Sequence, residues 1–195
     1  MSTSLLLQNI AKHVQLNEEE TVYFSSLIIS KKLPRKTLLL AAGQDCRYLS
    51  YVDSGALRSY YVDKDSREST IMFAIADWWI TDMYCYLNKK PAMMHIEAIE
   101  DSTILQISRL NFDQLLQQVP KFEKFFRILM QNAYTREQLR IMENLSSTAQ
   151  ERYDNFLIKY PQIVKQVTQK QIASYLGITP EFLSSLKKGK TKSIS

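Results

Sequence analysis

The stretch Thr168–Lys188, "TQKQIASYLGITPEFLSSLKK", contains two helix-like segments separated by one glycine. Apolar residues of the first segment recur at the spacing of a single helix face: Ile172, Ala173 and Leu176. Thr168 can cap this helix, because its hydroxyl accepts hydrogen bonds from amides of the first turn. Gly177 follows where a left-handed residue commonly ends a helix, and Ile178 supplies the apolar contact that accompanies such an end. The pattern therefore predicts a helix that stops at Gly177.

A second helix is predicted directly after this glycine. Thr179 can cap it, and Pro180 suits its first position, where a backbone N–H has no intrahelical partner. Leu183 and Leu186 supply its buried face. Two short helices joined by about three residues, with the small Ala173 where they cross, are what a helix-turn-helix requires. A plain helical hairpin is the alternative that this local chemistry leaves open.

The positive charge of the chain is concentrated around the same stretch. Residues 165–195 hold six lysines and one acid, Glu181, and their net charge of +5 equals that of the whole chain. Residues 121–195 carry +7, whereas residues 1–120 carry −2. A cationic helix-turn-helix is typical of proteins that neutralise phosphates on a DNA duplex. A solvated, lysine-rich surface explains the charge alone equally well.

Length and composition limit the class of protein. A chain of 195 residues with 45% hydrophobic content can bury a core and divide into one larger and one smaller domain. It has no run of 18 apolar residues and no basic leader at its start, so we expect a cytoplasmic protein without a membrane span. Cys46 and Cys85 are too few and too far apart in sequence for a disulfide framework, and we expect both to pack as small hydrophobic residues.

Catalysis is not predicted. His95 and Glu97 imitate the start of a zinc-deaminase signature, but the Pro-Cys-x-x-Cys part is absent. His13 and His95 are the only histidines, too few for a histidine-rich metal site. With glycines at 43, 55, 177 and 189 only, the chain has no phosphate-binding glycine loop. We therefore expect no enzyme activity, no metal and no resident cofactor.

The first half of the chain changes from helix to strand. Asn17 and Glu20 have capping-box spacing, and they precede a helix whose apolar residues are Val22, Phe24, Leu27 and Ile28. After "KKLPRK" come short β-branched or aromatic runs, interrupted at 53–55, 63–66 and 100–102. Several strands at such spacing favour a small antiparallel roll or barrel.

Helices follow the strands. "SRLNFDQLLQQ" predicts a short helix, and Pro120 begins another that continues for about 27 residues without glycine or proline. An apolar stripe at three-to-four spacing predicts a dimer interface along this long helix, at Phe122, Phe126, Leu129, Ala133, Ile141 and Leu145. Arg136, Glu137 and Arg140 interrupt the stripe, and packing of the helix on its own roll is the alternative. "TAQERYDNFLIKYPQIV" predicts a further helix that ends near Pro161.

The roll, the long helix, "ERYDNFLIKYPQI" and "TQKQIASYLGITPEFLS" resemble, in this order, the Crp/Fnr family of bacterial transcription regulators. The likeness spans nearly the whole chain, and "IASYLGITPEFLS" is similar to the phrase found in members from the Bacteroidetes. It implies an α+β fold: an antiparallel, jelly-roll type β-roll similar to a cyclic-nucleotide-binding domain in residues 1–118, a long dimerisation helix in 119–147 and a winged helix-turn-helix in 148–195. It also implies double-stranded DNA as partner, a homodimer, contact with RNA polymerase and no membrane.

The sensor domain departs from the family pattern. Relatives that bind cyclic AMP have a Gly-Glu pair for the ribose and an Arg-Ser pair for the phosphate. With Ile80 as anchor, the residues at these places and beside them define a candidate effector pocket: Trp79, Thr81, Asp82, Ala92 and Met93. Lys89 and Lys90 lie in an expected loop and lack the fork geometry of arginine. We therefore expect no cyclic AMP binding; a vestigial pocket, an apolar effector of unknown identity and plain core packing stay open.

The resemblance also places the DNA contacts. The candidates are Thr168, Gln169, Thr179, Pro180, Glu181, Ser184, Ser185, Lys187 and Lys188. Ser185 stands where the family usually has a base-reading arginine, so weaker base discrimination is expected. Glu181 either accepts from cytosine or only favours the helix dipole. The rival function is an effector-binding or interaction module whose C-terminal helices contact a protein and not DNA.

Overall fold

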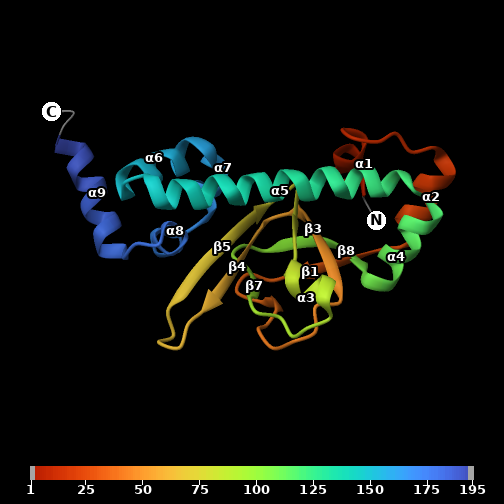
Figure 1. Cartoon of the computed structure of the whole chain (residues 1–195), viewed down its shortest axis with the longest axis horizontal. Coiled ribbons are helices and arrows are strands. Elements are labelled where there is room, and N and C mark those ends of the chain that lie inside the picture. Colours follow the sequence, from red (N-terminus) through yellow and green to blue (C-terminus); the bar gives the residue numbers. More distant parts are fainter. Residues whose placement is uncertain (1–2, 193–195) are drawn as a thin grey trace.

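The computed structural model describes residues 3–192. A long helix runs along one side of a β-roll, with two small groups of helices at its ends (Figure 1). The described helices are α1 (Ser4–Ala11), α2 (Glu18–Ser26), α3 (Met83–Asn88), α4 (Arg109–Gln118), α5 (Lys121–Ser146), α6 (Ala149–Lys159), α7 (Pro161–Gln166), α8 (Gln169–Leu176) and α9 (Pro180–Lys192). The expected α+β class is confirmed.

The roll consists of two four-stranded antiparallel sheets. Its strands are β1 (Ile28–Leu33), β2 (Leu38–Leu40), β3 (Tyr48–Ser54), β4 (Ala56–Val62), β5 (Glu68–Ile75), β6 (Trp78–Ile80), β7 (His95–Ala98) and β8 (Ser102–Ser108). One sheet has the order β1-β8-β3-β6 and the other β2-β7-β4-β5. Apolar side chains on the inner faces form the main core, which includes the fully buried Tyr51, Leu57 and Ile104.

The predicted interruptions mark the connections between strands, although Asp53 and Ser54 still belong to β3 and Ser102 begins β8. Gly55 joins β3 to β4 with φ +86°, a conformation that L side chains rarely adopt. A Cβ atom at this position would lie 2.6 Å from the Asp101 carbonyl oxygen, so the close approach of the two backbones also requires glycine. Between β4 and β5, the Asp63 carboxylate accepts from the amides of Asp65 and Arg67, both at 2.9 Å.

The N-terminal helix prediction is correct at its start and wrong at its end. Asn17 and Glu20 form the predicted capping box. Helix α2, however, ends at Ser26, and Ile28 begins β1, where it lies opposite Ile107 of β8. Strand β1 gains its backbone hydrogen bonds by pairing with β8. Its two consecutive lysines interrupt the apolar–polar alternation by which a strand is recognised in sequence. Helix α1 was not predicted.

Helix α5 has its first two turns inside the core of the roll. Phe122 and Phe125 are fully buried, and Phe126 is 6% exposed. The Phe122 ring stacks on Phe24 at 4.8 Å between centroids, and Phe126 lies edge-on to Trp79 at 5.6 Å. The prediction that Phe122 and Phe126 face a partner helix was therefore wrong, because the protomer's own aromatic residues cover them.

The C-terminal helices share a second core with the outside of the roll. This core contains Phe73 and Ile99 from the roll together with Tyr153, Phe156, Ile163, Ile172, Ala173, Leu176 and Leu183. The helix predicted to end near Pro161 is α6, which ends at Lys159, and Pro161 begins a further helix, α7. Residues 148–192 hold only helices and their connections, so the strands of the expected wing are not among the described residues. The division into three domains stays a prediction.

Burial predicts opposite outcomes for two neighbouring substitutions on α5. Phe122→Ala should lower the free energy of unfolding by about 3–5 kcal/mol, because it leaves a cavity in a fully packed aromatic cluster. Lys124→Ala, on the exposed side of the same turn, should change it by less than about 0.5 kcal/mol. Urea denaturation followed by circular dichroism measures both. A small loss for Phe122→Ala would contradict its place in the core.

Candidate functional site

Helices α8 and α9 form the predicted helix-turn-helix. Thr168 and Gln171 cap α8 through a capping box, with the Thr168 hydroxyl accepting from the Gln171 amide at 3.2 Å. Gly177 has φ +68° and ψ +33°, the left-handed conformation that was predicted. The amide of Ile178 donates to the Ala173 carbonyl at 3.0 Å and closes the end of the helix. The direction of the next helix is therefore fixed by backbone bonds.

Among the α9 side chains that the structure describes, Leu183 is buried against α8. The Thr179 hydroxyl accepts from the Phe182 amide at 3.2 Å, and Pro180 occupies the first helical position. Leu183 is fully buried next to Ala173, which is itself fully buried. The absence of a larger side chain at Ala173 lets the two helices approach closely.

All nine predicted DNA-contact residues lie on the surface: Thr168, Gln169, Thr179, Pro180, Glu181, Ser184, Ser185, Lys187 and Lys188. Four of them, at 181, 184, 185 and 188, share one face of α9 because they follow helical spacing. The Ser185 hydroxyl donates to the Glu181 carbonyl at 3.1 Å, which leaves its oxygen available as an acceptor. Helix α9 thus presents a narrow polar stripe with a lysine at its end.

The inner face of α8 is hydrogen-bonded to strand β5. The Ser174 hydroxyl accepts from the Thr70 amide at 2.9 Å and donates to the Glu68 carbonyl at 2.7 Å. Ring contacts extend this interface, since Tyr175 lies 5.4 Å from Phe73 between centroids. Burial raises the pKa of the Tyr175 hydroxyl, so it stays protonated and neutral at physiological pH. Helix α8 is therefore anchored on strand β5 of the roll.

Arg140 of α5 joins these two elements. Its guanidinium donates to the carbonyl of Ile71 and, at 3.1 and 3.4 Å, to those of Thr70 and Tyr175. It also lies 4.2 Å above the centre of the Tyr175 ring. The sequence showed Arg140 only as an interruption of an apolar stripe. The sequence did contain one signal of this contact. Arg136, Glu137 and Arg140 recur at helical spacing, so they share one face of α5, and this face contacts the roll.

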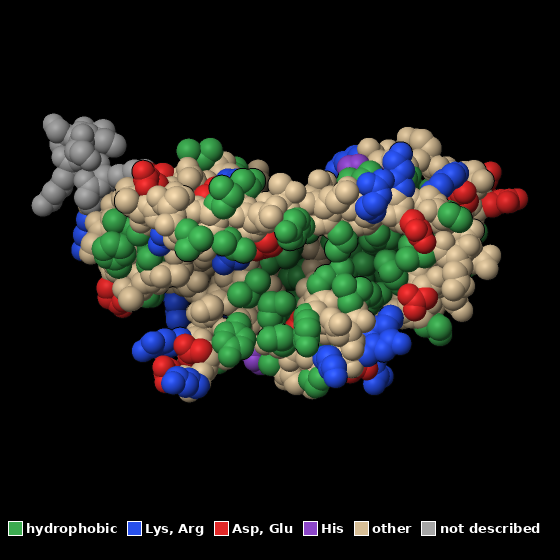
Figure 2. Space-filling view, in the orientation of Figure 1, with side chains coloured by type: hydrophobic (Ala, Val, Ile, Leu, Met, Phe, Trp, Pro, Cys, Tyr) green, Lys and Arg blue, Asp and Glu red, His purple; other side chains and the backbone are tan. Residues whose placement is uncertain are grey.

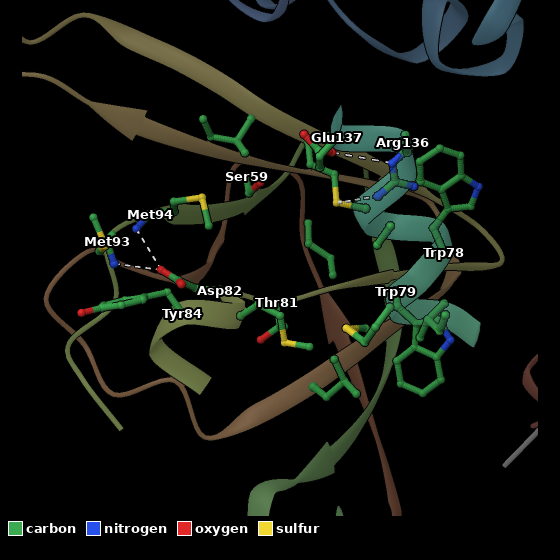
Figure 3. A pocket seen from close by; sticks show the side chains of 18 of the residues that line it. Ser59, Trp78, Trp79, Thr81, Asp82, Tyr84, Met93, Met94, Arg136 and Glu137 are labelled. Carbon is green, nitrogen blue, oxygen red and sulfur yellow. Dashed lines mark hydrogen bonds and ion pairs between the residues drawn. The ribbon is translucent and has the colours of Figure 1, made fainter. Parts of the chain in front are cut away.

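A cavity of about 650 Å³ lies between the roll and the middle of α5. Figure 2 shows hydrophobic side chains gathered in a hollow beneath the long helix, and Figure 3 shows the lining from close by. Most lining side chains are apolar, with methionines prominent at 72, 83, 93, 94 and 130. Of the predicted pocket residues, four line this cavity: Trp79, Thr81, Asp82 and Met93. Both tryptophans of the chain belong to its wall.

Ala92 does not line the cavity, and its prediction as a pocket residue was wrong. Its amide donates to the Gln44 carbonyl at 2.8 Å, and its own carbonyl accepts from the Gly43 amide at 2.8 Å. These two bonds hold Ala92 against a neighbouring loop, where its side chain is 5% exposed.

Asp82 fills the polar end of the cavity wall. Its fully buried carboxylate accepts from the amides of Met93 at 2.8 Å and Met94 at 3.2 Å (Figure 3). It also accepts from the Cys85 amide at 3.1 Å. Consecutive amides of this kind form a ready site for an anion. Here the protein's own carboxylate occupies them.

Among the described residues that line this cavity, Arg136 alone carries a positive charge. Its guanidinium lies 5.2 Å above the centre of the Trp78 ring and 3.7 Å from the Glu137 carboxylate. Lys89 and Lys90, which the sequence suggested as substitutes for a phosphate-binding arginine, are exposed and lie outside the lining. The cation of the wall is thus already paired with a carboxylate and an aromatic ring.

The exposed face of α5 differs from the predicted dimer stripe. Leu129 and Ala133 line the cavity, whereas Ile141 and Leu145 are 58% and 83% exposed. The sequence missed Tyr134 and Met142, which are 66% and 62% exposed. The apolar residues that are left for a partner therefore lie along the second half of the helix. Over residues 3–192, no helix combines the length and apolar character needed to cross a membrane.

Comparisons with known proteins agree with this arrangement. Residues 30–119 match the cyclic nucleotide-binding domain family. The chain is 26% identical over 183 residues to the fumarate and nitrate reduction regulatory protein of Vibrio cholerae. The matched region covers 88% of this chain and 72% of that protein. It is 25% identical over 186 residues to the regulatory protein HlyX of Actinobacillus pleuropneumoniae, with coverage of 88% and 75%.

Solved structures share the fold at low identity. The c-di-GMP responsive global regulator CLP of Xanthomonas campestris superposes with a TM-score of 0.76 at 14% identity, over 91% of this chain and 93% of that one. A transcriptional regulator of the Crp/Fnr family from Eubacterium rectale gives 0.73 at 20% identity, over 91% and 85%. These similarities extend across both the roll and the C-terminal helices.

Proposed function

We propose that the chain is a DNA-binding transcription regulator of the Crp/Fnr type, to whose members it is similar, and that it binds a two-fold symmetric operator as a homodimer through α9. The observation that carries the proposal is the polar stripe on α9, held outwards by the Gly177 corner and the buried Leu183. A helix presented in this way fits the major groove of DNA. The lysines at its end can neutralise DNA phosphates.

The exposed residues divide by chemistry. Glu181, Ser184 and Ser185 carry groups that accept or donate at base edges, so they read sequence. Lys187, Lys188, Thr168, Gln169 and Thr179 supply charge or hydrogen bonds for phosphates, so they set position and affinity. A serine hydroxyl hydrogen-bonds to either type of base, so a single serine contact discriminates weakly between sequences. We therefore expect sequence specificity to come from the contacts in both half-sites together.

The homodimer is supported by the exposed half of α5. Tyr134, Ile141 and Leu145 recur with seven-residue and four-residue spacing, which is the seam of a two-stranded coiled coil. Two copies joined along this seam would present two α9 helices, which need to be roughly 34 Å apart to enter successive major grooves on one side of a duplex.

The cavity supports a small, mostly apolar effector better than a cyclic nucleotide. Its Asp82 carboxylate already binds the amides that a phosphate would need, and repels a second anion. A buried phosphate without an arginine fork loses a charge-assisted contact worth about 1.5–3 kcal/mol. The methionine-rich wall instead adapts to apolar shapes.

Salt dependence separates DNA binding from a protein-binding alternative. We expect the affinity of the protein for duplex DNA to fall steeply and linearly in a log–log plot against salt concentration. Lys188→Ala should weaken binding on every sequence and reduce the slope by about one, whereas Ser185→Ala should change base preference. Lys124→Ala, far from α9, is the control for charge alone. Fluorescence anisotropy with labelled duplexes measures all four proteins, and a flat salt response would contradict DNA binding.

The seam predicts which exposed leucine matters for assembly. Leu145→Asp should shift the protein from dimer to monomer, because it places a charge in the apolar contact. Leu110→Asp, on α4 and also 68% exposed, is the matched control and should leave the dimer unchanged. Sedimentation velocity over a concentration series distinguishes the two results. Equal behaviour of both variants would place the interface elsewhere.

The two cavity tryptophans provide a direct test of the effector class. We expect the neutral apolar dye N-phenyl-1-naphthylamine to quench Trp78 and Trp79 on binding, and cyclic AMP to give no binding heat in calorimetry. Ala133→Phe should weaken dye binding by at least about tenfold, because the added ring fills the cavity. Asn132→Phe adds the same ring on the exposed side and is the control. Binding of cyclic AMP, or equal dye binding by both variants, would contradict the proposal.

A further inference from the structure

The two cysteines of the chain are neighbours in space although 39 positions separate them in sequence. Cys46 lies in the loop before β3, and Cys85 lies on α3. The Cys46 amide donates to the Cys85 sulfur at 3.1 Å. Both side chains are buried, at 3% and 0% exposure. The expectation that both cysteines pack as small hydrophobic residues does not explain why they contact each other.

We propose that Cys46 and Cys85 form a modification site, at which a small oxidant closes a reversible disulfide within one protomer. An amide nitrogen lies only about 1.5 Å from its own Cα. The 3.1 Å contact therefore brings the two Cα atoms close to the separation of about 4.4–6.8 Å that disulfides span.

Cys46 is the thiol that meets the oxidant first. It lines a second cavity, of about 190 Å³, together with Gln44 and Thr81, and its sulfur lies 3.1 Å from the Thr81 hydroxyl oxygen. Cys85 does not line that cavity, and its thiol donates to the Lys90 carbonyl at 2.7 Å. Burial raises the pKa of the Cys85 thiol, so it suits the second, intramolecular step.

The chemistry balances with a small-molecule disulfide such as oxidised glutathione. The Cys46 thiolate attacks one sulfur of the oxidant and releases one glutathione thiol. Cys85, as thiolate, then attacks the Cys46 sulfur of the mixed disulfide and releases the second glutathione thiol. Two protein thiols lose two electrons and two protons, and the oxidant gains both. Because Cys85 must lose its proton, closure should become faster as pH rises towards its elevated pKa.

The bond would fix a wall of the larger cavity. Cys85 lies in the first turn of α3, which Asp82 caps while its carboxylate holds the Met93 and Met94 amides. Arg109 already donates to the carbonyls of Cys46 at 2.6 Å and Cys85 at 3.5 Å, so the two backbones lie side by side in the reduced protein. The proposal does not rest on DNA binding.

The test uses the full chain in buffers of oxidised and reduced glutathione. After acid quenching, denaturation and alkylation with N-ethylmaleimide, intact mass reports free thiols and glutathione adducts, and peptide mapping identifies cross-links. We expect wild-type protein to lose both alkylation sites, to yield a linked Cys46–Cys85 peptide and to recover with dithiothreitol. Cys85→Ala should retain a glutathione adduct on Cys46, at least about tenfold more abundant than in wild type. Cys46→Ala should acquire almost none.

Two results would overturn the proposal. One is wild-type protein whose thiols both stay open to alkylation after denaturation at every glutathione ratio. The other is a wild-type glutathione adduct as abundant as that of Cys85→Ala, which would mean that Cys85 does not resolve it. Neither result depends on whether the protein binds DNA, so failure here and failure of the proposed function are distinguishable.

Discussion

The arrangement depends on one 26-residue helix that presents a different surface to each part of the molecule. The first turns of α5 bury Phe122 and Phe125 in the roll, and its middle forms one wall of the cavity. Arg140, further along, bonds the carbonyls of β5 and α8. The last turns of α5 expose Ile141 and Leu145. Because a helix is stiff over this length, a displacement at one of these contacts moves the others.

This geometry brings the cavity and the helix-turn-helix into contact through few residues. Met72 and Arg136 line the cavity and lie 4.0 Å apart, from sulfur to guanidinium nitrogen. One turn beyond Arg136, Arg140 contacts the carbonyl of Thr70, whose amide binds Ser174 of α8. A ligand that separated β5 from α5 would therefore act on the bonds that hold α8. Its effect is limited by the difference in its affinity for the two arrangements.

Local chemistry explains what the sequence predicted well. The caps at Thr168 and Thr179 and the left-handed Gly177 depend on neighbours within four residues, so their residue types suffice. Contacts between distant segments are a different matter. The apolar spacing of α5 identified a stripe, but only the fold reveals that Phe24 covers Phe122 while Leu145 stays open. For the same reason Arg140 looked like an interruption, and the contact between the two cysteines had no sequence signal at all. Ala92 was misplaced because alignment along the chain ignored its pairing with Gln44.

Selection of bound fragments from random duplex DNA at two ionic strengths tests most directly whether a symmetric dimer reads DNA. We expect an inverted repeat whose half-sites are centred about 10–10.5 base pairs apart or a multiple of this, enriched more sharply at the higher salt concentration. Enrichment of a single, asymmetric site, or of no sequence at either salt concentration, would contradict a symmetric dimer that reads DNA through α9.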